Sequence, residues 1–138
     1  MGIRRKSREF ALQVLYQLNI SKQDPLVALA QFGEHFQSVE GGDAFQRRLV
    51  LGVLEHCPEL DRLIERYSEN WRLDRINLIE RNILRMAIFE LLFCDEIPPK
   101  VTINEAIDLG KRFGSEDSGS FINGILDRIQ HEVVRKPI

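Results

Sequence analysis

Four basic side chains lie within eight positions at the start of the sequence: Arg4, Arg5, Lys6 and Arg8. At about 100° per residue, a helix over residues 5–19 turns Gln13 and Tyr16 to the same outer side as Arg5. Cationic side chains hold phosphates and an exposed ring stacks on a base, which is the combination that single-stranded RNA binding uses. The pattern predicts an RNA-binding surface; the alternative is a solvated charged face, with Tyr16 packed under another helix.

A second polar segment, FGSEDSGSF over residues 113–121, connects the last two predicted helices. Asp117 and the ring of Phe121 could be displayed there together with backbone donors, which would suit an RNA contact. The alternative is a structural turn, in which Asp117 or Ser118 caps the last helix and both Phe113 and Phe121 pack in the core. The local pattern alone favours the structural turn.

Charged residues also punctuate a very apolar stretch in the middle of the chain: Asp74, Glu80, Arg81 and Arg85. The apolar side chains of residues 75–93 cover more of a helix than one neighbour would bury, so this helix is expected at the centre of the fold. The charges around it could form the rim of a surface that binds a protein partner.

The sequence offers little to support catalysis or metal binding. Its histidines, His35, His56 and His131, are scattered, and none has a Ser, Cys or carboxylate at a recognisable nucleophile spacing. His56 and Cys57 are adjacent and would point about 100° apart on a helix, which prevents a simple grip on one ion. The glycines near the end follow no predicted strand, so they do not predict a phosphate-binding loop. We expect no catalytic residue, no metal and no cofactor.

Length and composition predict one domain over residues 1–138. The chain has 138 residues, of which 43% are hydrophobic, and its formal net charge of −2 means that any nucleic-acid-binding surface must be local. Two cysteines are too few for a disulfide framework, no leader pattern opens the sequence, and no apolar run reaches the roughly 18 residues of a membrane span. We expect a cytoplasmic protein that does not enter a membrane.

Helical spacing runs along nearly the whole chain, without the alternation typical of strands. We expect an all-α protein with six to seven helices, over about 5–19, 25–36, 44–57, 58–70, 75–93, 102–113 and 121–134. Asp24 is expected to cap the second helix, and Pro58 to interrupt the chain between the third and fourth. Thr102 and Glu105 form the pattern of a capping box, and Gly114 occupies the place of a left-handed residue after a helix.

The order and spacing of these stretches resemble the NusB family of bacterial transcription antitermination factors. The resemblance rests on RRKSREFALQVLYQL near the start, on IERNILRMAIFELLF, and above all on IPPKVTINEAIDLGKRFGSEDSGSFINGILDRI, and it covers nearly the whole chain. Residues 38–61 match the family only in the spacing of their apolar residues. The resemblance implies an all-α fold of two small, roughly perpendicular helical bundles and a non-catalytic, RNA-binding role.

The same resemblance implies partners and site residues. It implies binding of boxA-containing nascent RNA together with NusE, the ribosomal protein S10, within an RNA polymerase antitermination complex on ribosomal RNA operons. The implied RNA-binding residues are Arg4, Arg5, Lys6, Arg8, Tyr16, Asp117 and Phe121, beside which Gln13 is predicted from the helical wheel. The implied partner-facing region contains Glu80, with Asp74 and Arg85 as neighbours.

One departure from the family pattern is Ser120, because some members carry a lysine just before the last-helix phenylalanine, and a phosphate contact could therefore be missing.

Two other functions remain open. The fold also occurs as the N-terminal domain of ribosomal RNA cytosine methyltransferases, so the chain could be an RNA-targeting module. It could also be a pure protein-interaction adaptor whose basic surface binds no RNA.

Overall fold

The computed structural model describes residues 2–35, 42–69 and 72–134, and in these ranges it contains helices and no strand. The elements are α1 (Gly2–Ser21), α2 (Pro25–His35), α3 (Gly42–Tyr67), the short 3₁₀ helix η1 (Leu73–Arg75), α4 (Leu78–Phe93), α5 (Pro99–Phe113) and α6 (Ser118–Glu132). The prediction of an all-α fold is therefore confirmed. None of these helices is long and apolar enough to cross a membrane.

The chain divides into two compact units, Met1–Glu55 and His56–Ile138. In the first unit, α1 packs against α2, and Ala11, Val14 and Leu15 on the inner side of α1 are buried as the helical spacing predicts. Asp24 caps α2, because its Oδ1 accepts the backbone N–H of Leu26 at 2.8 Å. The prediction of this cap is confirmed, whereas the prediction of one domain over the whole chain stays a prediction.

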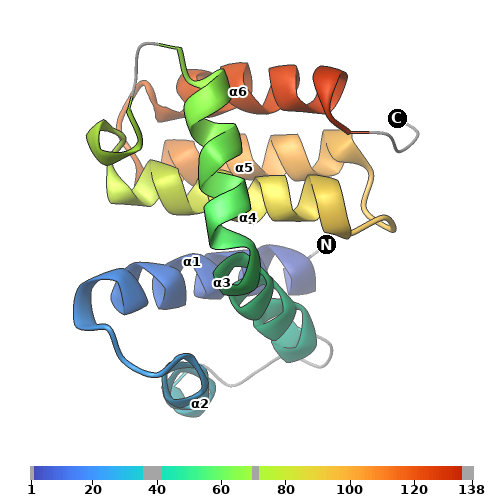
Figure 1. Ribbon diagram of the computed structural model, residues 1–138. Helices are drawn as coiled ribbons and strands as arrows, with labels where there is room; N and C mark the ends of the chain where they lie inside the picture. The colour runs from blue at the N-terminus through green and yellow to red at the C-terminus, as the bar shows by residue number, and fades with distance from the viewer. Residues whose placement is uncertain (1, 36–41, 70–71, 135–138) are drawn as a thin grey trace. The chain divides into compact units, whose positions relative to one another are not determined.

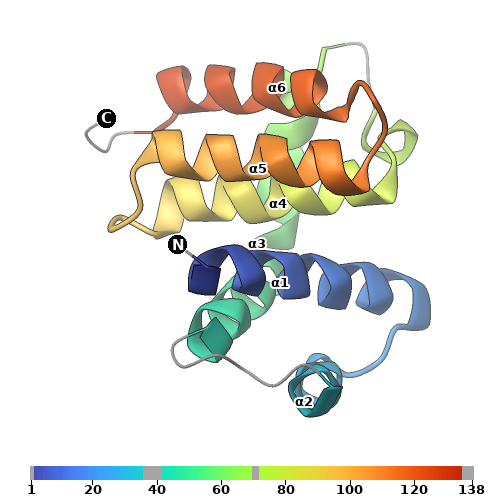
Figure 2. The same cartoon turned by 180° about the vertical axis from the view of Figure 1, so that it is seen from behind.

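The second unit is built around α4, which packs against α5 and α6. Figures 1 and 2 show these three helices side by side, with the second half of α3 crossing them. Every residue from 82 to 91 of α4 is buried, including polar ones. This confirms the expected central place of the helix, since a helix apolar all round needs neighbours on several sides.

The predicted break at Pro58 is wrong, because α3 continues through it from Gly42 to Tyr67. A proline inside a helix leaves the carbonyl four residues earlier without its usual N–H donor. That carbonyl belongs to Leu54, and both Leu54 and Pro58 are exposed, so water can supply the missing donor. The free-energy cost of Pro58 inside α3 is therefore low enough for burial of the helix's apolar face to outweigh it.

The predicted capping box at Thr102 is also wrong. Helix α5 begins three residues earlier, at Pro99, after Pro98 as the N-cap residue; proline is favoured in the first turn because its fixed φ suits a helix. Thr102 is buried inside the helix, and its hydroxyl donates to Glu90 Oε1 at 2.9 Å. It thereby provides a partner for a buried carboxylate, which would be costly to leave unpaired.

Gly114 ends α5 in an extended conformation, with φ −99° and ψ −154°, so the predicted left-handed residue is wrong. Close approach, rather than a positive φ, favours glycine at this position. A Cβ atom there would collide with the Ser118 side chain and would lie 2.8 Å from the carbonyl oxygen of Gly110. The connection between α5 and α6 is therefore tightly packed.

Candidate functional site

The basic start of the chain lies on the first turns of α1. Arg4, Arg5 and Lys6 are exposed there, whereas Arg8 retains only 4% exposure. The guanidinium groups of Arg4 and Arg8 lie 5.2 and 5.4 Å from the centroid of the Phe45 ring, a cation–π arrangement that joins α1 to α3. The expectation of four surface cations is thus wrong for Arg8, which the sequence could not distinguish from its neighbours.

The outer side of α1 continues the exposed surface beyond the cations. Gln13 is exposed, and Tyr16, three residues later on the same side of the helix, is 38% exposed. Tyr16 is therefore not wholly covered by another helix. A partly exposed ring that stays anchored to its helix can stack on a planar group with little loss of conformational freedom.

The connection between α5 and α6 displays Asp117 to solvent. Asp117 stands at the N-cap position of α6, but its side chain makes no capping hydrogen bond. Phe121 is half-buried and Phe113 is 40% exposed, so the expectation that both rings lie in the core is wrong for Phe113. The structural interpretation of this segment therefore does not account for Asp117.

Ser118 is the polar centre of this connection. Its side chain is fully buried, its Oγ accepts the backbone N–H of Ser115 at 2.9 Å, and its hydroxyl donates to Glu80 Oε2 at 2.5 Å. Glu80 lies in the first turn of α4, where its own N–H donates to the N-cap Asn77 at 2.8 Å. These bonds fasten the segment that carries Asp117 to α4.

The contact between Ser118 and Glu80, which are separated by 38 positions in the chain, was not predicted from the sequence. No local pattern signals such a contact. Glu80 is half-buried rather than fully displayed, and its carboxylate already accepts a hydrogen bond within the unit. Any contact of Glu80 with a partner would have to share the carboxylate with Ser118.

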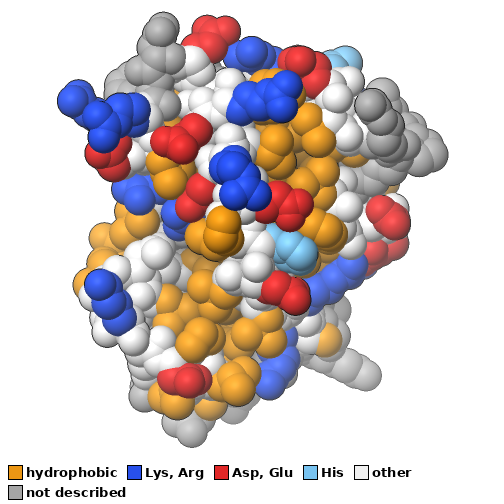
Figure 3. Space-filling view, viewed as in Figure 1, with side chains coloured by type: hydrophobic (Ala, Val, Ile, Leu, Met, Phe, Trp, Pro, Cys, Tyr) orange, Lys and Arg blue, Asp and Glu red, His pale blue; other side chains and the backbone are white. Residues whose placement is uncertain are grey.

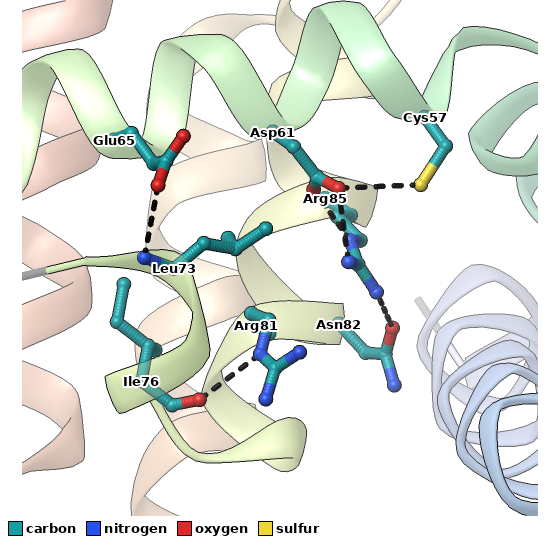
Figure 4. Close-up of polar contacts among 8 residues, drawn as sticks. All are labelled: Cys57, Asp61, Glu65, Leu73, Ile76, Arg81, Asn82 and Arg85. Atoms are coloured by element: carbon teal, nitrogen blue, oxygen red, sulfur yellow. Dashed lines mark hydrogen bonds and ion pairs between the residues drawn. The ribbon is translucent and has the colours of Figure 1, made fainter.

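Arg85 does not lie on a charged rim, because it is only 6% exposed. Figure 4 shows its guanidinium facing Asp61 of α3, with Nε and Nη2 donating to the two carboxylate oxygens at 2.7 and 3.1 Å. Its Nη1 donates to Asn82 at 3.0 Å. The expectation of a surface charge at Arg85 is wrong, since this bidentate pair holds α3 and α4 together inside the unit.

The thiol of Cys57 belongs to the same cluster, and its Sγ–H donates to Asp61 Oδ2 at 3.6 Å. Burial raises the pKa of Cys57; the positive charge of Arg85 opposes this rise, and the carboxylate of Asp61 adds to it. The thiol is therefore held in its neutral, less nucleophilic form. In the described ranges, 2–35, 42–69 and 72–134, no three His, Cys, Asp or Glu side chains are grouped so that they could hold a metal ion.

Asp74 remains at the surface, on η1 just before α4. It is paired at 3.3 Å with Arg72, which is also exposed, and such a pair contributes little to stability. Two bonds shown in Figure 4 hold the backbone on either side of it: Glu65 Oε2 accepts the N–H of Leu73 at 3.2 Å, and Arg81 Nε donates to the carbonyl of Ile76 at 3.0 Å. Asp74 is thus an exposed carboxylate on an ordered turn.

On the face that α3 crosses, acidic and basic side chains are interspersed, and hydrophobic side chains reach the surface between them (Figure 3). Across its described residues, the chain is an all-helical protein whose first helix displays cations and a partly exposed aromatic ring. The model of the NusB family matches residues 5–131.

Known proteins similar to this chain agree with that match. The transcription antitermination protein NusB of Myxococcus xanthus is 50% identical over 133 residues, which cover 94% of this chain and 95% of the relative. The structure of T. maritima NusB superposes with a TM-score of 0.89 at 39% identity, covering 96% and 93% of the two chains. A crystal structure of the antitermination factors NusB and NusE in complex with double-stranded RNA superposes with a TM-score of 0.86 at 28% identity, covering 95% and 98%. The chain belongs to the NusB family.

Proposed function

We propose that this chain is a non-catalytic transcription antitermination factor that acts in the cytoplasm. It binds boxA-containing RNA together with NusE, the ribosomal protein S10, and supports RNA polymerase on ribosomal RNA operons. The observation that carries the proposal is the display of Arg4, Arg5, Lys6 and Tyr16 on one helix of a NusB-family chain. A similar protein crystallised with NusE and RNA supports it further.

On α1, Arg4, Arg5 and Lys6 bind phosphates, while Gln13 offers an amide to a base or a sugar. Tyr16 stacks on a base, a contact that tolerates any sequence because every base has a flat face. Arg8 supports these residues from behind, since it fixes the start of α1 against the buried ring of Phe45.

Asp117 and Phe121, in the second unit, form an RNA contact of their own, which discriminates between RNA sequences. A carboxylate is repelled by phosphate, so the favourable use of Asp117 is to accept hydrogen bonds from a base or from a 2′-hydroxyl group. The half-buried ring of Phe121 stacks beside it. Ser120 supplies no positive charge at this contact, unlike the cations of α1.

The NusE-binding face centres on the exposed Asp74 of η1, just before α4, where a carboxylate can pair with basic residues of a ribosomal protein. Glu80 contributes through its half-buried carboxylate. Arg85 contributes indirectly, because its ion pair with Asp61 holds the underlying helices in place.

The test is a titration of single-stranded boxA-like RNA with the parent chain, with Tyr16→Ala and with the control Ile20→Ala. Ile20 is an exposed apolar residue one turn further along α1. Loss of a stacked base costs on the order of 1–3 kcal/mol, so Tyr16→Ala should bind at least about fivefold more weakly, whereas Ile20→Ala should match the parent.

Two outcomes would contradict the proposed function and support one of the alternative functions instead. If the parent binds NusE but no RNA, single- or double-stranded, the chain is a protein adaptor. If it binds structured ribosomal RNA in preference to boxA-like RNA, it is an RNA-targeting module of the kind found in the cytosine methyltransferases.

A further inference from the structure

A surface depression of about 360 Å³ lies between the end of α3 and α6. Residues that line it include Tyr67, Glu69, Ser120, Phe121, Gly124 and Arg128. Its volume is within the range of about 300–1,000 Å³ that holds small ligands. Apart from Phe121 and Ser120, these residues have no role in the RNA contacts proposed above.

The cationic wall of the depression is fixed in place by three contacts. Arg128 Nη1 donates to the carbonyl oxygen of Tyr67 and to Glu69 Oε1, both at 3.1 Å, and the guanidinium lies 5.4 Å from the centroid of the Tyr67 ring. The Arg128 side chain is nevertheless 41% exposed. A planar positive group is therefore held in one orientation while part of it faces solvent.

Gly124 of α6 borders open space in the depression. A Cβ atom added at this position would meet no heavy atom within 4 Å. Phe121, Gly124 and Arg128 are spaced three and four residues apart and therefore share one side of α6. Along this side of α6 an aromatic ring is followed by a position without a side chain and then by a cation. The three span about 10 Å of the helix axis, at roughly 1.5 Å per residue.

We propose that this depression binds one unpaired nucleotide of RNA; the inference rests on the proposed RNA-binding function. The base lies over Gly124 beside the ring of Phe121, and Arg128 meets the adjoining phosphate. Ser120 and Glu69 offer a hydroxyl and a carboxylate to the base edge or the 2′-hydroxyl group. Because Glu69 repels phosphate, its carboxylate contacts the base edge or the 2′-hydroxyl group and leaves the phosphate to Arg128.

A substitution that fills the depression tests this directly. Gly124→Leu places an apolar side chain in the open space, and glycine is a poor residue inside a helix, so the variant should be at least as stable as the parent to heat. Asn123→Leu is the matched control, because Asn123 is the exposed neighbour on α6 and does not line the depression. Both variants and the parent are titrated with single-stranded boxA-like RNA and with RNAs that lack one base at a time.

Gly124→Leu should weaken RNA binding at least about fivefold, the lower bound for a lost base contact, while Asn123→Leu should stay within about twofold of the parent. At one position, removal of the base should weaken the parent but not Gly124→Leu, because the two changes delete the same contact.

Unchanged binding by Gly124→Leu, while Phe121→Ala binds RNA poorly, would overturn the inference and leave the proposed function intact. Weaker binding of NusE alone by Gly124→Leu would also overturn it, because the depression would then hold protein. Failure of the parent to bind any RNA would overturn the proposed function and this inference together.

Discussion

Replacement of Glu80 tests whether the α5–α6 connection is held by its hydrogen bond to α4. Glu80→Ala removes the acceptor of the buried Ser118 hydroxyl, whose bond measures 2.5 Å. Hydrogen bonds to charged groups contribute about 1.5–3 kcal/mol. Ser115 Oγ lies 3.2 Å from Ser118 Oγ and can accept its proton instead, so we expect Glu80→Ala to lose about 1.5 kcal/mol of unfolding free energy, the lower end of that range. Glu80→Gln keeps an acceptor oxygen and should lose less than half of this.

The assay is urea unfolding monitored by helical circular dichroism, with Ser118→Ala and the double variant completing a thermodynamic cycle. A coupling free energy of about 1 kcal/mol or more between the two positions is expected, because they form one contact. Strict additivity, or an unfolding free energy of Glu80→Ala equal to that of the parent, would refute the reasoning. RNA titration of the same variants should show a smaller preference for boxA-like over scrambled RNA in Glu80→Ala than in Glu80→Gln, since Asp117 is adjacent to Ser118.

Four further outcomes follow from the exposures and contacts described above. With the three exposed cations of α1 and Arg128 each meeting one phosphate, the slope of log affinity against log salt should be about −3 on single-stranded RNA, at roughly −0.7 per phosphate. Arg5→Ala should reduce its magnitude by about 0.7, whereas Arg8→Ala should mainly lower the melting temperature. Asp117→Asn should bind RNA equally well or more tightly in titrations, with a narrower gap between boxA-like and scrambled RNA and no loss of stability, because Asp117 makes no capping bond. Asp61→Ala should cost about 3 kcal/mol in urea unfolding, because it leaves the buried Arg85 without its carboxylate. Since its pKa is raised, Cys57 should react with iodoacetamide at pH 8.5 more slowly than a free thiol, and a rate equal to that of free cysteine would contradict the described environment.

Features that depend on neighbours in the sequence could be predicted. The helical period alone separates the buried side of α1 from the exposed side that carries Gln13 and Tyr16. The cap at Asp24 and the central place of α4 follow from equally local patterns. Each of these outcomes depends on residues within a few turns of one another, where periodicity and capping preferences act directly.

Features that depend on contacts between distant segments could not be predicted. Arg8 and Arg85 look like surface charges in the sequence, yet one lies over the ring of Phe45 and the other pairs with Asp61. Thr102 matches a capping pattern, but the buried carboxylate of Glu90 takes its hydroxyl. In each case a polar group on a different helix determines the outcome, and the sequence pattern contains no information about that group.

The central claim is that the chain binds boxA RNA together with NusE, and the most direct test is a titration of boxA-like and scrambled RNA with and without NusE at fixed salt. The account predicts that NusE tightens the binding of boxA-like RNA by at least about fivefold, the lower end of typical coupling between sites, and tightens scrambled RNA much less. Equal dissociation constants for the two RNAs, unchanged by NusE, would contradict it.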